Sequence, residues 1–145
     1  MIIDLGEGTD IHPKNKRDVA ARLVRWALAK DYGVKIPYRS PEFKDVQFTG
    51  AKAVVTIDTF GSTLRTFDAV EARGFVICGA DRQWKRAEAK LAGPNRIDVS
   101  SPEVQNPAAV RYAWADNPVC NVYSAEGLPL TPFRSDDFEM ITKPK

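Results

Sequence analysis

The fold class of this chain can be inferred first from the run Lys44-Asp45-Val46-Gln47-Phe48-Thr49-Gly50-Ala51-Lys52-Ala53-Val54-Val55-Thr56-Ile57. In its first half, apolar and polar residues alternate, and Thr49-Gly50 then provides a turn signal. Its second half is rich in β-branched residues. Period-two alternation and β-branched enrichment are typical of strands. The run therefore predicts two short strands joined by a tight turn.

Further stretches of the same character follow this run, separated by clusters of turn residues. They are residues 74–78, 84–91, 96–99 and 109–114. In the last of these, Val110, Tyr112 and Trp114 share one face, which predicts a half-buried strand. Six or seven short strands at this spacing predict a mainly β fold, an antiparallel β-sandwich. The proline-containing tail from Gly127 is expected to run as an extended strap over it.

The N-terminal part of the chain has a different pattern. Residues 1–5 form a short apolar run, as at the end of a strand, and residues 6–10 have loop composition. Val19, Leu23 and Trp26 then recur with the spacing of one helical face, which predicts one long α-helix over residues 13–32. Gly33 is suited to end it. The basic residues between 14 and 25 are expected to form a solvated face.

Composition limits the classes of function. A chain of 145 residues is long enough for one ordinary domain, and 43% apolar with 28% charged residues is typical of globular proteins. The net charge of +2 favours neither a nucleic acid nor a membrane partner. No signal peptide is visible at the N-terminus. Cys78 and Cys120 are expected to be buried small residues; a disulfide between them and the redox compartment stay open.

The only histidine, His12, lies two residues after Asp10 and directly before Pro13. A histidine in this setting is more often a loop residue at a helix start, and Asp10 could serve as a helix cap or loop acceptor. The alternative is an imidazole base held by a carboxylate, as in a nucleophile–histidine–aspartate relay. That alternative requires a nucleophile, and the sequence offers no convincing one.

The remaining candidate residues have simple structural explanations. Ser62 lies in Gly61-Ser62-Thr63-Leu64, which is expected to be a plain turn, and Ser124 lacks the surroundings of a nucleophile elbow. No phosphate-binding loop and no metal-ligand spacing is present, so no cofactor or metal is expected. Four aromatic residues could stack on sugar rings but are more often core: Trp84, Tyr112, Trp114 and Tyr123.

The sequence resembles sialate O-acetylesterases, which are carbohydrate esterases of the SGNH-hydrolase type. The resemblance starts at Asp10-Ile11-His12-Pro13-Lys14-Asn15-Lys16 and is strongest at Ala109-Val110-Arg111-Tyr112-Ala113-Trp114-Ala115-Asp116-Asn117-Pro118. It also includes Tyr38-Arg39-Ser40-Pro41, Gly74-Phe75-Val76-Ile77, Asn121-Val122-Tyr123, Glu126-Gly127-Leu128-Pro129 and Pro132-Phe133-Arg134. It therefore covers nearly the whole chain.

This resemblance implies that the chain is the C-terminal part of such an enzyme. Residues 1–33 would be the last loop and helix of an α/β hydrolase domain, and residues 34–145 a β-sandwich domain. His12 would be the catalytic base, while the serine would lie upstream. The clan usually places its aspartate three residues before the histidine, where this chain has Thr9. Either Asp10 or another group would then orient His12.

The resemblance also implies partners and a location. The substrate would be O-acetylated sialic acid or a similar acetylated glycan, and the remainder of the hydrolase domain would be a partner. The parent enzyme is expected in the periplasm or outside the cell. The isolated chain is expected to be inactive, and its apolar helix face to self-associate or to fold onto the sandwich. The alternative is a non-catalytic carbohydrate-binding or structural module.

Overall fold

The computed structural model of the chain describes residues 1–6, 8, 10 and 12–139. One helix, α1 (Lys16–Lys30), precedes all the strands of this part of the chain. The strands are β1 (Glu42–Thr49), β2 (Lys52–Asp58), β3 (Leu64–Thr66), β4 (Phe75–Cys78), β5 (Lys85–Arg86), β6 (Glu88–Leu91), β7 (Arg96–Ser100), β8 (Ala109–Tyr112), β9 (Val122–Ser124) and β10 (Phe133–Arg134).

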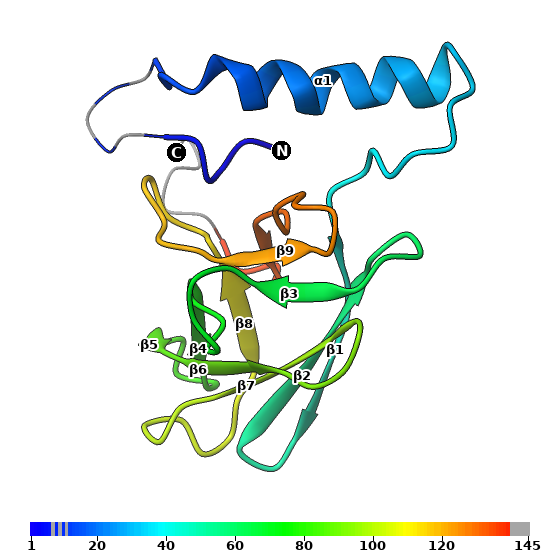
Figure 1. Ribbon diagram of the computed structural model, residues 1–145. Coiled ribbons are helices and arrows are strands. Elements are labelled where there is room, and N and C mark those ends of the chain that lie inside the picture. Colours follow the sequence, from blue (N-terminus) through cyan, green and yellow to red (C-terminus); the bar gives the residue numbers. More distant parts are fainter. Residues whose placement is uncertain (7, 9, 11, 140–145) are drawn as a thin grey trace.

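The strands form two four-stranded sheets and a two-stranded one. The first sheet has the order β1-β2-β7-β6, the second has the order β10-β8-β4-β5, and β3 pairs with β9. Every pairing is antiparallel. Figure 1 shows the strands gathered in one body, with α1 lying across one end of it. The predicted mainly β fold with antiparallel sheets is confirmed.

One hydrophobic core lies between the sheets. In β2 the buried residues alternate with half-exposed ones, so that Ala53, Val55 and Ile57 all face inward. The second sheet contributes larger rings: Phe75 and Tyr112 pack with their centroids 4.7 Å apart. Burying side chains of this size contributes roughly 1.5–3 kcal/mol each, so this core is the main source of stability.

Two strand predictions are wrong in detail. Residues 84–91 do not form one strand, because the chain passes from the second sheet (β5) to the first (β6) at Ala87. The alternation expected through Trp114 also ends early. Ala113 has a φ of +49°, which ends β8 at Tyr112 and leaves Trp114 44% exposed.

Three short strands were not anticipated. These are β3, β9 and β10, each of two or three residues. β10 pairs with β8 and so incorporates the C-terminal tail into the second sheet. The tail before it also covers the core, with Leu130 fully buried and the Thr131 N–H donating to the Pro41 carbonyl at 3.0 Å.

The helix is shorter than predicted at both ends. It begins at Lys16 rather than at Pro13, because Asn15 is its N-cap and accepts a hydrogen bond from the Asp18 N–H at 3.1 Å. It ends at Lys30, and Gly33 lies just beyond with a φ of +67°, as expected of a terminating glycine. No helix among the described residues is long and apolar enough to cross a bilayer.

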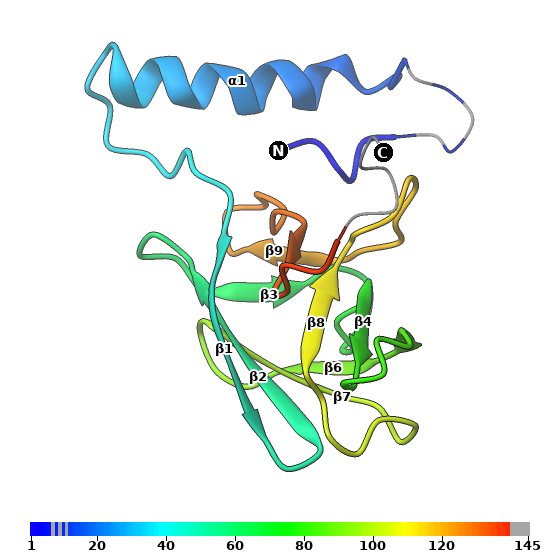
Figure 2. The same ribbon diagram turned by 180° about the vertical axis from the view of Figure 1, so that it is seen from behind.

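The apolar face of α1 is largely exposed. Leu23 and Trp26, on the face expected to self-associate or to fold onto the sandwich, are 67% and 46% exposed. Arg22, expected in solvent, lies against the N-terminal segment and donates to Asp4. In Figure 2 the N-terminal segment runs between α1 and the strands, so that α1 contacts this segment rather than the core. The prediction of a uniformly solvated basic face is therefore wrong at Arg22.

Candidate functional site

The loop before α1 brings Asp10 and His12 together. The Asp10 Oδ1 accepts a hydrogen bond from the backbone N–H of His12 at 2.8 Å, and both residues are exposed. A carboxylate that accepts from the N–H two residues on is the hydrogen bond of an Asx turn. Asp10 is therefore a loop acceptor and not the cap of α1. Thr9 and Ile11 lie outside the described residues.

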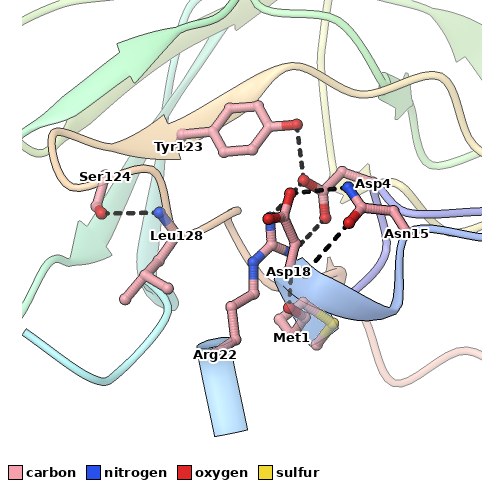
Figure 3. A network of polar contacts seen from close by, with 8 residues as sticks. All are labelled: Met1, Asp4, Asn15, Asp18, Arg22, Tyr123, Ser124 and Leu128. Atoms are coloured by element: carbon pink, nitrogen blue, oxygen red, sulfur yellow. Dashed lines mark hydrogen bonds and ion pairs between the residues drawn. The ribbon is translucent and has the colours of Figure 1, made fainter. Parts of the chain in front are cut away.

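A polar network next to this loop joins three distant segments (Figure 3). Arg22 of α1 donates two hydrogen bonds to the Asp4 carboxylate, at 2.6 and 2.7 Å. Tyr123 of β9 donates its hydroxyl to Asp4 at 3.1 Å. Arg22 also donates to the Met1 carbonyl at 2.9 Å. We call Asp4, Arg22 and Tyr123 the clamp, because they tie α1 through the N-terminal segment to the strands.

The electrostatics of the clamp follow from its burial. The side chains of Arg22 and Asp4 are only 13% and 10% exposed. Burial alone would raise the pKa of Asp4, but the hydrogen bonds and charge of Arg22 outweigh it and hold that pKa below its usual value. Burial, together with the Asp4 charge, raises the pKa of Tyr123 to about 12. The clamp is thus an ionised pair with a neutral phenol donor at neutral pH.

Sequence reasoning did not find this clamp. Arg22 was assigned to solvent, and Tyr123 was treated as a sugar-stacking or core residue. The available signal was weak: Asp4 is a charged residue inside an apolar run, and such a residue requires a partner when it is buried. Nothing in the sequence identifies that partner.

Neither serine considered as a nucleophile has the surroundings of one. Ser62 donates its hydroxyl to Glu126 Oε2 at 2.6 Å, so that its partner is a carboxylate and not an imidazole. Ser124 is buried in β9 and accepts from the Leu128 N–H at 3.3 Å. Because Ser124 is only 2% exposed, an external ester cannot reach its hydroxyl in this conformation.

Ser62 does, however, line an open groove of about 450 Å³. The groove lies between the connector after α1, the loop after β2 and the turn after β9. Its lining residues are Lys35, Ile36, Pro37, Tyr38, Arg39, Thr59, Phe60, Ser62 and Glu126. Neither Asp10 nor His12 lines it.

The four aromatic residues proposed for sugar stacking have different roles. Tyr112 is fully buried, as expected for core, and Tyr123 belongs to the clamp. Trp84 is covered by the Arg111 guanidinium, which lies 4.2 Å from its ring centroid. Trp114 alone of the four keeps an exposed ring.

The described residues contain no group of three or more histidine, cysteine, aspartate or glutamate side chains that could hold a metal ion. Cys78 and Cys120 are both free thiols. Burial raises the pKa of each, so that neither is activated as a nucleophile.

Two kinds of comparison with known proteins give matches. The family model described as the sialate O-acetylesterase C-terminal domain matches residues 42–137. The chain also superposes on the crystal structure of a novel carbohydrate acetylesterase from Xanthomonas citri, with a TM-score of 0.88 and 43% sequence identity. None of the curated proteins matches the chain.

The structural match covers 93% of this chain but only 31% of the Xanthomonas citri protein. The chain therefore spans about a third of that relative. Residues 42–145 make up less than three quarters of the chain. A structural match over 93% of the chain must therefore also include residues before 42, which the family model does not reach.

Proposed function

Because the chain belongs to the family of sialate O-acetylesterase C-terminal domains, we propose that it completes a serine esterase that removes O-acetyl groups from sialic acid or a related sugar. The observation that carries this proposal is the 93% coverage by a carbohydrate acetylesterase structure at 43% identity, which extends beyond the family domain toward Asp10 and His12. In this proposal residues 34–145 form the sandwich domain, and residues 1–33 are the final loop and helix of the hydrolase domain.

His12 has the central chemical role in this proposal. A serine from the rest of the enzyme attacks the acetyl carbonyl, and the imidazole of His12 takes the serine proton. His12 then gives that proton to the sugar oxygen as the C–O bond breaks, which leaves an acetyl-serine. In the second step His12 takes a proton from water, whose oxygen attacks the acetyl group. His12 then returns that proton to the serine oxygen as the acetyl–serine bond breaks and acetate leaves.

Asp10 supports His12 through the backbone in this scheme. Its Oδ1 accepts from the His12 N–H at 2.8 Å, which holds the loop in the conformation that presents the histidine. We propose that Asp10 is a positioning residue, and that a second contact from Asp10 or from the hydrolase domain orients the imidazole. The exposure of both residues fits a loop that another part of the enzyme covers.

A chimera tests the role of His12. The corresponding C-terminal third of the Xanthomonas citri acetylesterase is replaced by this chain, and hydrolysis of 4-nitrophenyl acetate and of an O-acetylated sialic acid is measured. We expect an active chimera whose kcat falls at least about 1,000-fold in His12→Ala. In Asp10→Asn, which keeps the carbonyl acceptor for the His12 N–H, kcat should fall much less than in Asp10→Ala.

One result of the same assay would contradict the role of His12. A folded, active chimera in which His12→Ala retains activity would show that the base lies elsewhere. The chain alone is expected to hydrolyse neither ester, since no described serine is paired with a histidine. Hydrolysis by the isolated chain that His12→Ala abolishes would contradict that expectation.

A second role, structural support, is favoured by the clamp. Tyr123 of the sandwich and Arg22 of α1 both bind the Asp4 carboxylate. We propose that the sandwich holds the helix and the His12 loop in place through this contact. In keeping with the family, we also propose a periplasmic or extracellular location for the parent enzyme.

A further inference from the structure

The open groove between the connector after α1 and the loop after β2 is not used by the esterase proposal. Its lining includes residues 35–39 of the connector that follows α1, whereas His12 precedes α1 in the chain; Figure 1 shows this connector leaving the C-terminal end of the helix. Arg25, in the second half of α1, donates to the carbonyl of the groove residue Pro37 at 3.0 Å, so the groove lies beside that half of the helix. With about 450 Å³, the groove falls within the roughly 300–1,000 Å³ of small-molecule sites.

Phe60 presents an aromatic ring in this groove from a constrained backbone. Its φ is +52°, a conformation that costs a bulky residue about 1–2 kcal/mol, and the Asp58 carboxylate stabilises it by accepting from the Phe60 N–H at 2.9 Å. The Arg39 guanidinium lies 3.6 Å from the ring centroid, yet the residue remains 38% exposed. An exposed ring fixed in this way can stack on the apolar face of a sugar.

Glu126 adds a fixed acceptor. Ser62 donates to its Oε2 at 2.6 Å, and this hydrogen bond lowers the pKa of Glu126 below its usual value. The carboxylate is therefore ionised and oriented. Since a carboxylate offers about four acceptor positions, Glu126 can also accept from the hydroxyl groups of a ligand.

Two cations line the groove beside this carboxylate. Arg39 has one contact to Glu42 at 3.2 Å, in which both side chains are well exposed and the charge is only partly compensated. Lys35 forms no ion pair with any residue that the structure describes, and its side chain lies in solvent. The lining therefore carries an excess of positive charge next to an aromatic ring and a hydroxyl acceptor.

We propose that this groove binds a sugar residue that bears a carboxylate, such as a sialic or hexuronic acid. The sugar ring stacks on Phe60, its hydroxyl groups donate to Glu126, and its carboxylate pairs with Lys35 and Arg39. The site holds a carbohydrate without acting on it. The proposal is independent of the esterase chemistry, since none of the groove residues takes part in it.

The test is a titration of the isotope-labelled chain followed by amide chemical shifts. The methyl glycoside of N-acetylneuraminic acid is compared with its neutral methyl ester and with sodium acetate. We expect saturable shifts at residues 35–39, 58–63 and 124–127 for the acid, with roughly tenfold weaker binding of the ester because it lacks the charge. Acetate should bind more weakly still, because it offers no ring to stack.

Three variants locate the site. Lys35→Gln and Glu126→Gln should each weaken binding of the acid roughly tenfold. Phe60→Asn should abolish stacking while tolerating the positive φ, so that the fold is retained. Lys90→Gln, which removes a matched exposed lysine from β6, should bind like the wild type.

The contrary outcomes are equally specific. No shift with any sugar at high millimolar concentration would overturn the proposal, as would saturable shifts confined to another face. Equal affinity for the acid and the ester would refute the carboxylate pairing. Equal affinity for acetate and the sugar would reduce the groove to an anion site.

Discussion

Replacing Arg22 with alanine should release α1 from the sandwich without unfolding the core. The side chains of Arg22 and Asp4 are 13% and 10% exposed and share two hydrogen bonds, at 2.6 and 2.7 Å. Breaking a fully buried pair costs about 3–5 kcal/mol, whereas an exposed pair contributes about 0–1 kcal/mol. At this intermediate exposure, we expect the loss of the pair to lower the free energy of local opening by about 2 kcal/mol. Local opening of α1 should therefore increase about 30-fold.

Hydrogen exchange measures this local opening. In Arg22→Ala the amides of α1 should lose protection, while those of β2 and β7 keep theirs, because the core strands do not contact Arg22. Arg17→Ala is the matched control, since Arg17 lies exposed on the same helix. Unchanged protection of α1 in Arg22→Ala, or an equal loss in Arg17→Ala, would refute the reasoning.

The clamp also predicts a pH dependence. The pKa of Asp4 is lowered in the folded protein, so its contribution to stability is present above the unfolded value of 3.8 and is lost as the pH falls through the folded value. The difference in free energy of unfolding between the wild type and Arg22→Ala should thus be constant near neutral pH and shrink below pH 3.8. A difference that persists in acid would mean that Arg22 acts through packing alone.

Three further predictions concern other parts of the fold. Gly74→Ala should lower the free energy of unfolding in urea by roughly 2–4 kcal/mol, and Gly61→Ala by only about 1 kcal/mol. Both glycines have a positive φ, but only at Gly74 would an added Cβ lie 3.1 Å from the Cβ of Cys120. Equal losses in the two variants would show that crowding at Gly74 adds nothing to the cost of the positive φ. Cys78 and Cys120 should react with a disulfide reagent far more slowly when folded than in urea, with Cys78 the slower because it is fully buried. Leu23, exposed on α1, should support concentration-dependent self-association in analytical ultracentrifugation that Leu23→Glu reduces; a wild-type monomer at all concentrations would reject it.

The β-rich part of the fold could be predicted because its information is local. In β2 the alternation of Ala53, Val55 and Ile57 is visible in the sequence and reappears as burial. The errors arose where tertiary structure overrides this pattern. The change of sheet at Ala87 and the positive φ of Ala113 both interrupt runs that look continuous in the sequence.

The candidate site was predictable only in part for a related reason. Asp10 and His12 are two residues apart, so their proximity follows from the sequence, and the structure adds which atoms meet. The clamp, by contrast, joins Asp4 to Tyr123 across 119 positions, and local pattern carries no information about such a pair. The assignment of Arg22 to solvent was wrong for the same reason, because its partner, the buried Asp4 carboxylate, lies 18 positions away in the sequence.

The clamp has a consequence for how the two parts of this chain could separate. A boundary at Gly33 would leave Asp4 and Arg22 on one piece and Tyr123 on the other, so the exposed seam would carry a carboxylate, a guanidinium and a phenol. Water solvates such groups well, so a polar surface of this kind can separate and pair again without aggregation. The sandwich, expressed by itself, should accordingly remain soluble. The clamp is the contact that such a separation would have to break.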